Sequence, residues 1–137
     1  MPVEFIRKPA GLGEPLGRYS HVSVARGTEI VSVAGQVGID ASGNTSGDGS
    51  VAAQTRQAFA NLATALSAVG LSPADIFKTT TYLVGSDSLA EFMQARGEIF
   101  PELFPDGQYP PNTLLIVSRL VEERLSVEVE ALAVRGA

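Results

Sequence analysis

The segment "TLLIV" at residues 113–117 constrains the fold most, because four apolar side chains follow one another without interruption. Alternate side chains of a strand point to opposite faces, so Leu114 and Ile116 face one way while Leu115 and Val117 face the other. Both faces of this strand therefore need a cover of apolar groups. Helices packed on one face would satisfy only half of that requirement.

The rest of the chain supplies two helices and four further strands. Apolar residues recur at helical spacing after residues 51 and 88, whereas other segments alternate or are rich in β-branched residues. Ser88 and Glu91 match a capping box, which predicts the start of the second helix. The predicted strands are residues 19–25, 29–37, 78–84, 113–120 and 125–134, with the first two joined as a hairpin. The predicted helices are residues 51–69, a short turn at 72–75, and a helix from 88 that ends near Pro101.

This order of elements predicts an α+β fold in which two helices pack on one face of a mixed sheet. The opposite face would then leave a sizeable apolar patch in water, so we expect further copies of the chain to cover it. No repeat or linker interrupts the pattern. We therefore expect one domain over residues 1–137.

Charge and composition narrow the range of partners. The chain has 15 acidic and 10 basic side chains, a net charge of -5, and no cluster of Lys or Arg, so nucleic acid is not the expected partner. The absence of cysteine excludes disulfides and thiolate chemistry. The first residues lack a signal-peptide core and no apolar run suits a membrane span. We expect a soluble, cytoplasmic protein without a membrane partner.

Two carboxylates lie on one face of the last predicted strand. Alternation places Glu128 and Glu130 beside Leu132, and a half-buried carboxylate there would have a raised proton affinity and could hold or deprotonate a water. The alternative is that both glutamates are solvated at the rim of the sheet. Glu128 is thus a candidate catalytic residue with a structural alternative.

Other polar residues give weaker signals. His21, the only histidine, lies within a predicted strand and is expected to be packed or hydrogen-bonded, because no nucleophile motif accompanies it. One histidine with scattered acids has no metal-ligand spacing, and no glycine-rich nucleotide fingerprint occurs, so neither a metal nor another cofactor is expected. Arg96 could reach an anion from the second helix, but an exposed arginine near the end of that helix is the simpler expectation.

Several segments together resemble the Rid/YjgF family of reactive intermediate deaminases (RidA-like proteins). They are "YSHVSVARG", "VAGQVGID", "QAFANLATALSAVGLSPADIFKTTTYL", "YPPNTLLIV" and "VEVEALAV", in this order between residues 19 and 134. The resemblance implies a homotrimer of a chorismate-mutase-like α+β fold, with clefts for small polar metabolites between subunits. Active members hydrolyse enamines or imines to 2-oxo acids and ammonia without a metal or an organic cofactor.

The resemblance also assigns roles to particular positions. In active members a glutamate on the last strand positions the attacking water, which matches Glu128, and a pocket tyrosine matches Tyr19. The backbone around Gly35 and Leu114 falls where members line the cleft.

The chain departs from the family pattern at three positions. An arginine at the start of the fifth strand grips the substrate carboxylate in active members, but Asn112 stands there in this sequence. Asparagine carries no charge and cannot reproduce that bidentate contact. Ala34 replaces a common serine, and Arg96 stands where asparagine is usual. The chain therefore resembles a branch of the family that lacks the arginine.

Four hypotheses about function follow. The first is a trimeric protein that binds, or acts on, a small polar metabolite through Asn112 and Glu128. The second is an enamine or imine deaminase in which Glu128 positions the water. The third, a ribonuclease, conflicts with the acidic charge balance and the single histidine. The fourth is a scaffold that binds protein partners.

Overall fold

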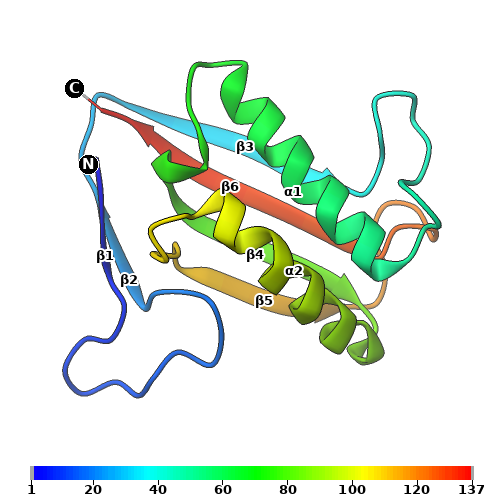
Figure 1. The fold of residues 1–137 in the computed structure, drawn as a ribbon, viewed down its shortest axis with the longest axis horizontal. Helices are drawn as coiled ribbons and strands as arrows, with labels where there is room; N and C mark the ends of the chain where they lie inside the picture. Colours follow the sequence, from blue (N-terminus) through cyan, green and yellow to red (C-terminus); the bar gives the residue numbers. More distant parts are fainter. Residues whose placement is uncertain (1, 137) are drawn as a thin grey trace.

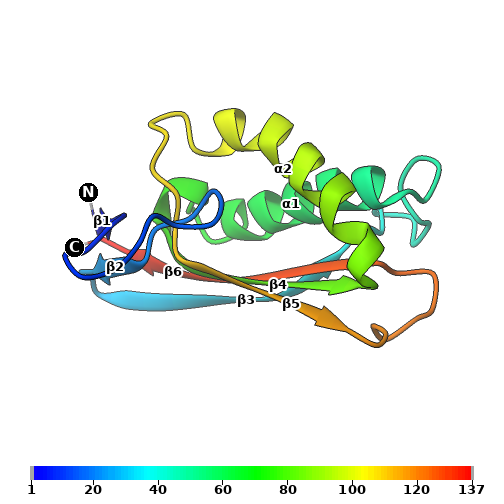
Figure 2. The ribbon, with the colours of Figure 1, turned by 90° about the horizontal axis from the view of Figure 1, so that it is seen from below.

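A computed structural model describes residues 2–136 as a four-stranded sheet with two long helices on one face (Figures 1 and 2). A separate two-stranded ribbon lies beside one end of the sheet. The strands are β1 (Val3–Ile6), β2 (Val22–Ala25), β3 (Glu29–Val37), β4 (Ile76–Val84), β5 (Asn112–Val117) and β6 (Val127–Arg135). The helices are α1 (Val51–Ser67) and α2 (Leu89–Leu103), with short 3-10 turns η1 (Pro73–Asp75) and η2 (Ser86–Ser88).

The sheet is mixed, with the strand order β3-β6-β4-β5. The β4–β5 pair is parallel, whereas β6 is antiparallel to both β3 and β4. The α+β class with two helices on one face is therefore confirmed. The core between helices and sheet contains Val33, Phe59, Leu62, Leu66, Leu83, Phe92, Val127, Val129, Ala131 and Ala133, among others.

The predicted hairpin between residues 19–25 and 29–37 is wrong. β2 pairs with β1, a strand that the sequence pattern did not reveal, and β3 pairs with β6. The connection between β2 and β3 lies against the end of β6, where Thr28 N donates to Arg135 O. A Cβ at Gly27 would lie 2.0 Å from the same carbonyl oxygen. The chain therefore turns onto β6 instead of folding back along β2.

The predicted capping box at the second helix is also wrong. Ser88 has helical backbone angles because it ends the η2 turn, and its hydroxyl donates to Val84 O instead of accepting from the helix. Glu91 Oε2 accepts from Ala52 N in the first turn of α1. A carboxylate is favourable at this end of a helix, so Glu91 joins α2 to α1.

Gln54 fastens α1 to the segment that enters β6. Its side chain is fully buried, its Nε2 donates to Gly49 O and Arg124 O, and its Oε1 accepts from Ser126 N. These three bonds satisfy backbone groups in the loops before α1 and before β6, where no neighbouring strand supplies a partner. Gln54 is thus an amide whose loss would leave several buried polar groups without partners.

We predict that Gln54→Leu lowers the free energy of unfolding by about 2 to 4 kcal/mol, because three part-buried hydrogen bonds to the backbone are lost. Urea denaturation of the purified protein measures this. Gln94→Leu, at an exposed position of α2, is the matched control and should change stability by less than about 0.5 kcal/mol. Equal effects of the two changes would contradict the role assigned to Gln54.

The face of the sheet opposite the helices has no covering layer within residues 2–136 (Figure 2). The strand register places Tyr82, Glu128, Glu130, Leu132 and Leu115 on it. Leu115 is 44% exposed and Leu132 is 37% exposed. This open face is mixed in character, with a Tyr82–Glu130 hydrogen bond among apolar side chains.

Candidate functional site

A surface pocket of about 510 Å³ lies where the outer edge of the sheet meets α2. Three segments far apart in the sequence form it: the loop before β2, the α2 helix and the start of β5. Its lining residues are Leu16, Gly17, Tyr19, Leu89, Met93, Arg96, Asn112, Thr113 and Leu114. Four of the residues singled out from the sequence, Tyr19, Arg96, Asn112 and Leu114, thus share one pocket.

Asn112 is held by two hydroxyl groups of the neighbouring strand. It pairs with Thr79 at the start of the parallel β4–β5 ladder, and its Oδ1 accepts from Thr79 Oγ1 and Thr81 Oγ1, both at 2.9 Å. Both threonines are buried. These bonds use the acceptor end of the amide, so Asn112 presents its donor end, Nδ2, to the pocket.

Arg96 is buried, and the expectation of an exposed arginine is wrong. Only 2% of the residue is exposed, and its guanidinium lies over the rings of Phe92 and Phe100, at 5.3 and 5.5 Å from the centroids. One nitrogen donates to Met93 Sδ at 2.8 Å, and Nε has no hydrogen-bond partner among residues 2–136. The small Gly17 makes room for it, because a Cβ there would lie 3.0 Å from the Arg96 guanidinium.

Burial lowers the pKa of Arg96 to about 10, and the positive charge of nearby Arg18 adds to this effect. The guanidinium still carries its charge at neutral pH. A buried charge without an opposite charge is costly, so its retention in a pocket suggests a function other than stability.

The loop before β2 forms the outer wall of the pocket. Tyr19 Oη accepts from Leu16 N at 3.1 Å, which fixes the tyrosine against the loop. The ring of Tyr19 also packs edge-on against His21, whose Nε2 donates to Gly13 O at 2.8 Å. His21 is therefore hydrogen-bonded, as expected, although it lies just before β2. Leu16, 96% exposed, borders the pocket with an uncovered apolar side chain.

The remaining predicted residues, Glu128, Gly35 and Ala34, lie away from this pocket. β3 has an irregular register between Val33 and Gln36, and a Cβ at Gly35 would lie 1.9 Å from Glu128 Oε2. The glycine is required because the glutamate side chain lies directly on the backbone. Ala34, beside it, is exposed.

Glu128 is partly buried on the open face. Burial raises the pKa of its carboxyl, and the neighbouring Glu130 carboxylate adds to the rise. The pKa of Tyr82 is also raised, mainly by its hydrogen bond to the Glu130 carboxylate and further by burial and by the negative charge of Glu130. The expected increase in the proton affinity of Glu128 is thus present.

The two groups of residues lie on opposite faces of the sheet. Asn112 pairs with Thr79, which faces the helices, whereas Glu128 pairs with Tyr82 on the open face. A single chain therefore does not bring Glu128 to the pocket of Asn112 and Arg96.

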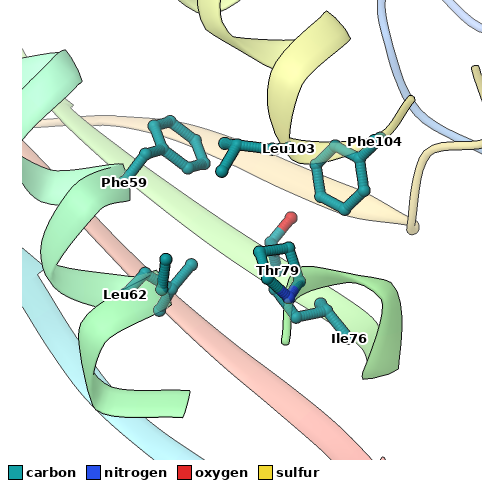
Figure 3. A pocket seen from close by; sticks show the side chains of 8 residues that line it. Phe59, Leu62, Ile76, Thr79, Leu103 and Phe104 are labelled. Carbon is teal, nitrogen blue, oxygen red and sulfur yellow. The ribbon is translucent and has the colours of Figure 1, made fainter. Parts of the chain in front are cut away.

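A second cavity lies inside the core between the helices and the sheet (Figure 3). Its volume of about 10 Å³ is close to the space of one water molecule, and its walls are apolar apart from Thr79. The side chains of Phe59, Leu62 and Leu103 close it in Figure 3. It is a packing gap and too small for a metabolite.

Within residues 2–136, no three His, Cys, Asp or Glu side chains come together as they would around a metal ion. In the same part of the chain, no helix has the length and apolar character needed to span a membrane.

Comparison with known proteins identifies the family of this chain. The model of the family described as "Endoribonuclease L-PSP", which is the Rid/YjgF family, matches residues 11–135. The chain belongs to this family. A Rid-family protein of unknown function from Yersinia pestis has a similar structure, with a TM-score of 0.84 at 29% identity, covering 98% of this chain and 100% of that chain.

Two sequence relatives show the range within the family. A RutC family protein of Pyrococcus horikoshii is 32% identical over 120 residues, which is 88% of this chain and 89% of the relative. A rat (Rattus norvegicus) protein named 2-iminobutanoate/2-iminopropanoate deaminase is 31% identical over 121 residues, which is 88% of this chain and 82% of the relative. Some relatives in the Rid/YjgF family are thus named imine deaminases.

Sequence reasoning missed several residues of this Rid-family pocket. Leu16, Gly17, Leu89 and Met93 line it without any motif that marks them. Arg18 was also missed, although it lies against α2, where a Cβ at Gly97 would be 3.0 Å from its guanidinium. The small glycines beside Arg18 and Arg96 were the only available signal, because they leave room for long side chains.

We predict that Glu128→Gln makes the protein more stable than the wild type at pH 7. A carboxyl with a raised folded-state pKa loses stability as pH rises from its unfolded value through its folded value, and glutamine removes that loss. Urea denaturation near pH 7 and near pH 3.5 measures the difference, which should vanish at the lower pH. Glu123→Gln, at an exposed carboxylate, should give no gain at pH 7. A gain that persists unchanged in acid would contradict the electrostatic origin.

Proposed function

We propose that this Rid-family chain forms a homotrimer that binds a small polar metabolite in a cleft between subunits, and that it is an inefficient imine deaminase. The observation that carries the proposal is the separation of the candidate residues onto opposite faces of one chain. Only a neighbouring copy can bring its Glu128 to the pocket that contains Asn112. The uncovered apolar side chains Leu16, Leu115 and Leu132 support an interface with such a copy.

Asn112 is the reason to expect inefficient hydrolysis. A guanidinium at the start of β5 would grip a carboxylate with two parallel charge-assisted bonds, whereas Asn112 offers one neutral amide. That amide is also committed to Thr79 and Thr81 through its oxygen. The contact that remains is a donor, suited to a carbonyl or hydroxyl oxygen.

A second candidate is a working enamine or imine deaminase. The raised pKa of Glu128 favours it, because burial and the neighbouring Glu130 make this carboxylate a stronger proton acceptor than an ordinary glutamate. In that mechanism Glu128 of one subunit would position a water for attack on the C=N carbon, releasing a 2-oxo acid and ammonia. RNA is a poorer candidate substrate, because the net charge of -5 opposes phosphate binding.

A coupled assay tests the catalytic part of the proposal. A dehydratase generates 2-aminoacrylate from serine, and release of the 2-oxo acid is followed with and without the protein. We expect the wild type to add little to spontaneous hydrolysis. The double change Asn112→Arg with Arg96→Asn restores the residues usual in active members and should raise the rate about tenfold or more.

A single and a triple variant provide the controls. Arg96→Asn alone should stay inactive, and adding Glu128→Ala to the active double variant should remove the gained activity. A wild type that is already fast, and loses its activity with Glu128→Ala, would replace the proposal with the deaminase alternative.

Sedimentation of Leu132→Lys tests the subunit interface. We expect the wild type to sediment as a trimer and the variant as a smaller species with an unchanged circular dichroism spectrum. The new charge would lie beside Lys78 on the open face and would be buried when another copy packs there. Leu12→Lys, at an exposed loop position, should leave the trimer intact. A trimeric Leu132→Lys protein would exclude the open face as the contact surface.

A further inference from the structure

Two arginines beside the pocket, Arg18 and Arg96, have no carboxylate partner among residues 2–136. Seven of the ten Lys and Arg side chains form ion pairs within residues 2–136, and all seven pairs are on the surface. Arg18 and Arg96 are not among them, although acidic side chains outnumber basic ones. Arg18 and Arg96 are thus two neighbouring positive charges that no carboxylate of the described residues neutralises.

The local structure holds Arg96 in place at the pocket wall. The aromatic rings of Phe92 and Phe100 and the sulfur of Met93 surround its guanidinium, and all three come from α2 itself. Its Nε is buried and has no acceptor among the described residues. Arg18 adds a second positive charge, which disfavours the charged state of Arg96. Arg96 lines the pocket, so an anion bound there would supply the missing opposite charge and relieve the repulsion between the two cations.

The other walls indicate which anion fits. Leu89, Met93 and Leu114 provide apolar surface beside the guanidinium, and Asn112 offers an amide donor near it. A compact, strongly hydrated phosphate would lose its water against these side chains. A carboxylate on a short aliphatic chain would place its charge on Arg96 and its carbons against the leucines.

We infer that Arg96, with Arg18 behind it, is an anion-binding site that holds the carboxylate of a small aliphatic acid from the α2 side of the pocket. The inference deepens the proposed function, on which it rests for the nature of the cleft, by assigning the ligand a negative charge. Arg96 on α2 supplies the positive charge that Asn112 on β5 lacks. The carboxylate of the ligand therefore points toward α2 instead of β5.

Binding of 2-oxobutanoate, followed by NMR line broadening and by thermal shift, tests this inference. Butanoate and butanamide form a pair of nearly equal size, one charged and one neutral, and inorganic phosphate is the fourth probe. We expect the wild type to bind the two carboxylates about tenfold or more tightly than the amide, and phosphate weakly. Arg96→Met should abolish the preference for the carboxylate, and Arg96→Lys should restore part of it, because lysine retains the charge without the planar fork.

Two further variants separate charge from folding. Arg18→Met should weaken carboxylate binding by a smaller factor, whereas Arg56→Met, which breaks an exposed ion pair on α1, should not affect it. Arg96→Met should unfold at the wild-type temperature or above it, since an uncompensated buried charge is removed. Unchanged carboxylate binding by Arg96→Met, or tighter binding of phosphate than of butanoate, would overturn the inference.

Oligomeric state distinguishes this inference from the proposed function. All residues of the anion site belong to one chain, so a monomeric wild type that binds butanoate through Arg96 would overturn the trimer and leave the site intact. The converse result is a trimer that binds no carboxylate and dissociates with Arg96→Met. It would show that Arg96 pairs with a carboxylate of a neighbouring copy, and the anion site would be rejected.

Discussion

The packing of β6 between two neighbouring strands and beneath both helices fixes most of this molecule. Val127, Val129 and Ala133 are fully buried on its helix side, and β3 and β4 pair along its two edges. Strand alternation then places Glu128 and Glu130 on the opposite face, whatever their chemical role. The environment of Glu128 thus follows from core packing. The separation of this glutamate from the pocket at β5 is a consequence of the same alternation.

The fold could be predicted from the sequence wherever one pattern governs a whole element. Helical spacing in α1 and alternation in β6 predicted the two layers, because each pattern depends on neighbours along the chain. The pairing of β2 and β3 could not be predicted. β1, the partner of β2, is only four residues long, and β6, the partner of β3, lies about a hundred residues away in sequence. Glu91 matched a local capping motif but satisfies another helix, a contact that only the tertiary arrangement creates.

The pocket shows the same limit for charged residues. An arginine on an amphipathic helix is normally exposed. Phe92 and Phe100 stand four residues before and after Arg96, so helical spacing predicts their rings beside it, but it does not predict that another segment covers the guanidinium. Burial depends on the loop before β2, which closes over α2 at Gly17. The family resemblance placed Asn112 at the start of the fifth strand, but its hydrogen bonds to two threonine hydroxyls depend on the parallel pairing with β4, which the sequence did not predict.

β5 is the last strand of the sheet, and among residues 2–136 it pairs along one edge only, with β4. Thr113 and Leu114 border the pocket, so peptide N–H and C=O groups of a free strand edge are available there. Substitutions cannot remove these groups, whereas the side chains that face them come from α2 and from an irregular loop. The pocket thus combines backbone hydrogen-bonding groups of β5, which stay the same, with side chains that can vary independently of the sheet. Such an arrangement allows the ligand preference of the fold to change without altering the strands that support it.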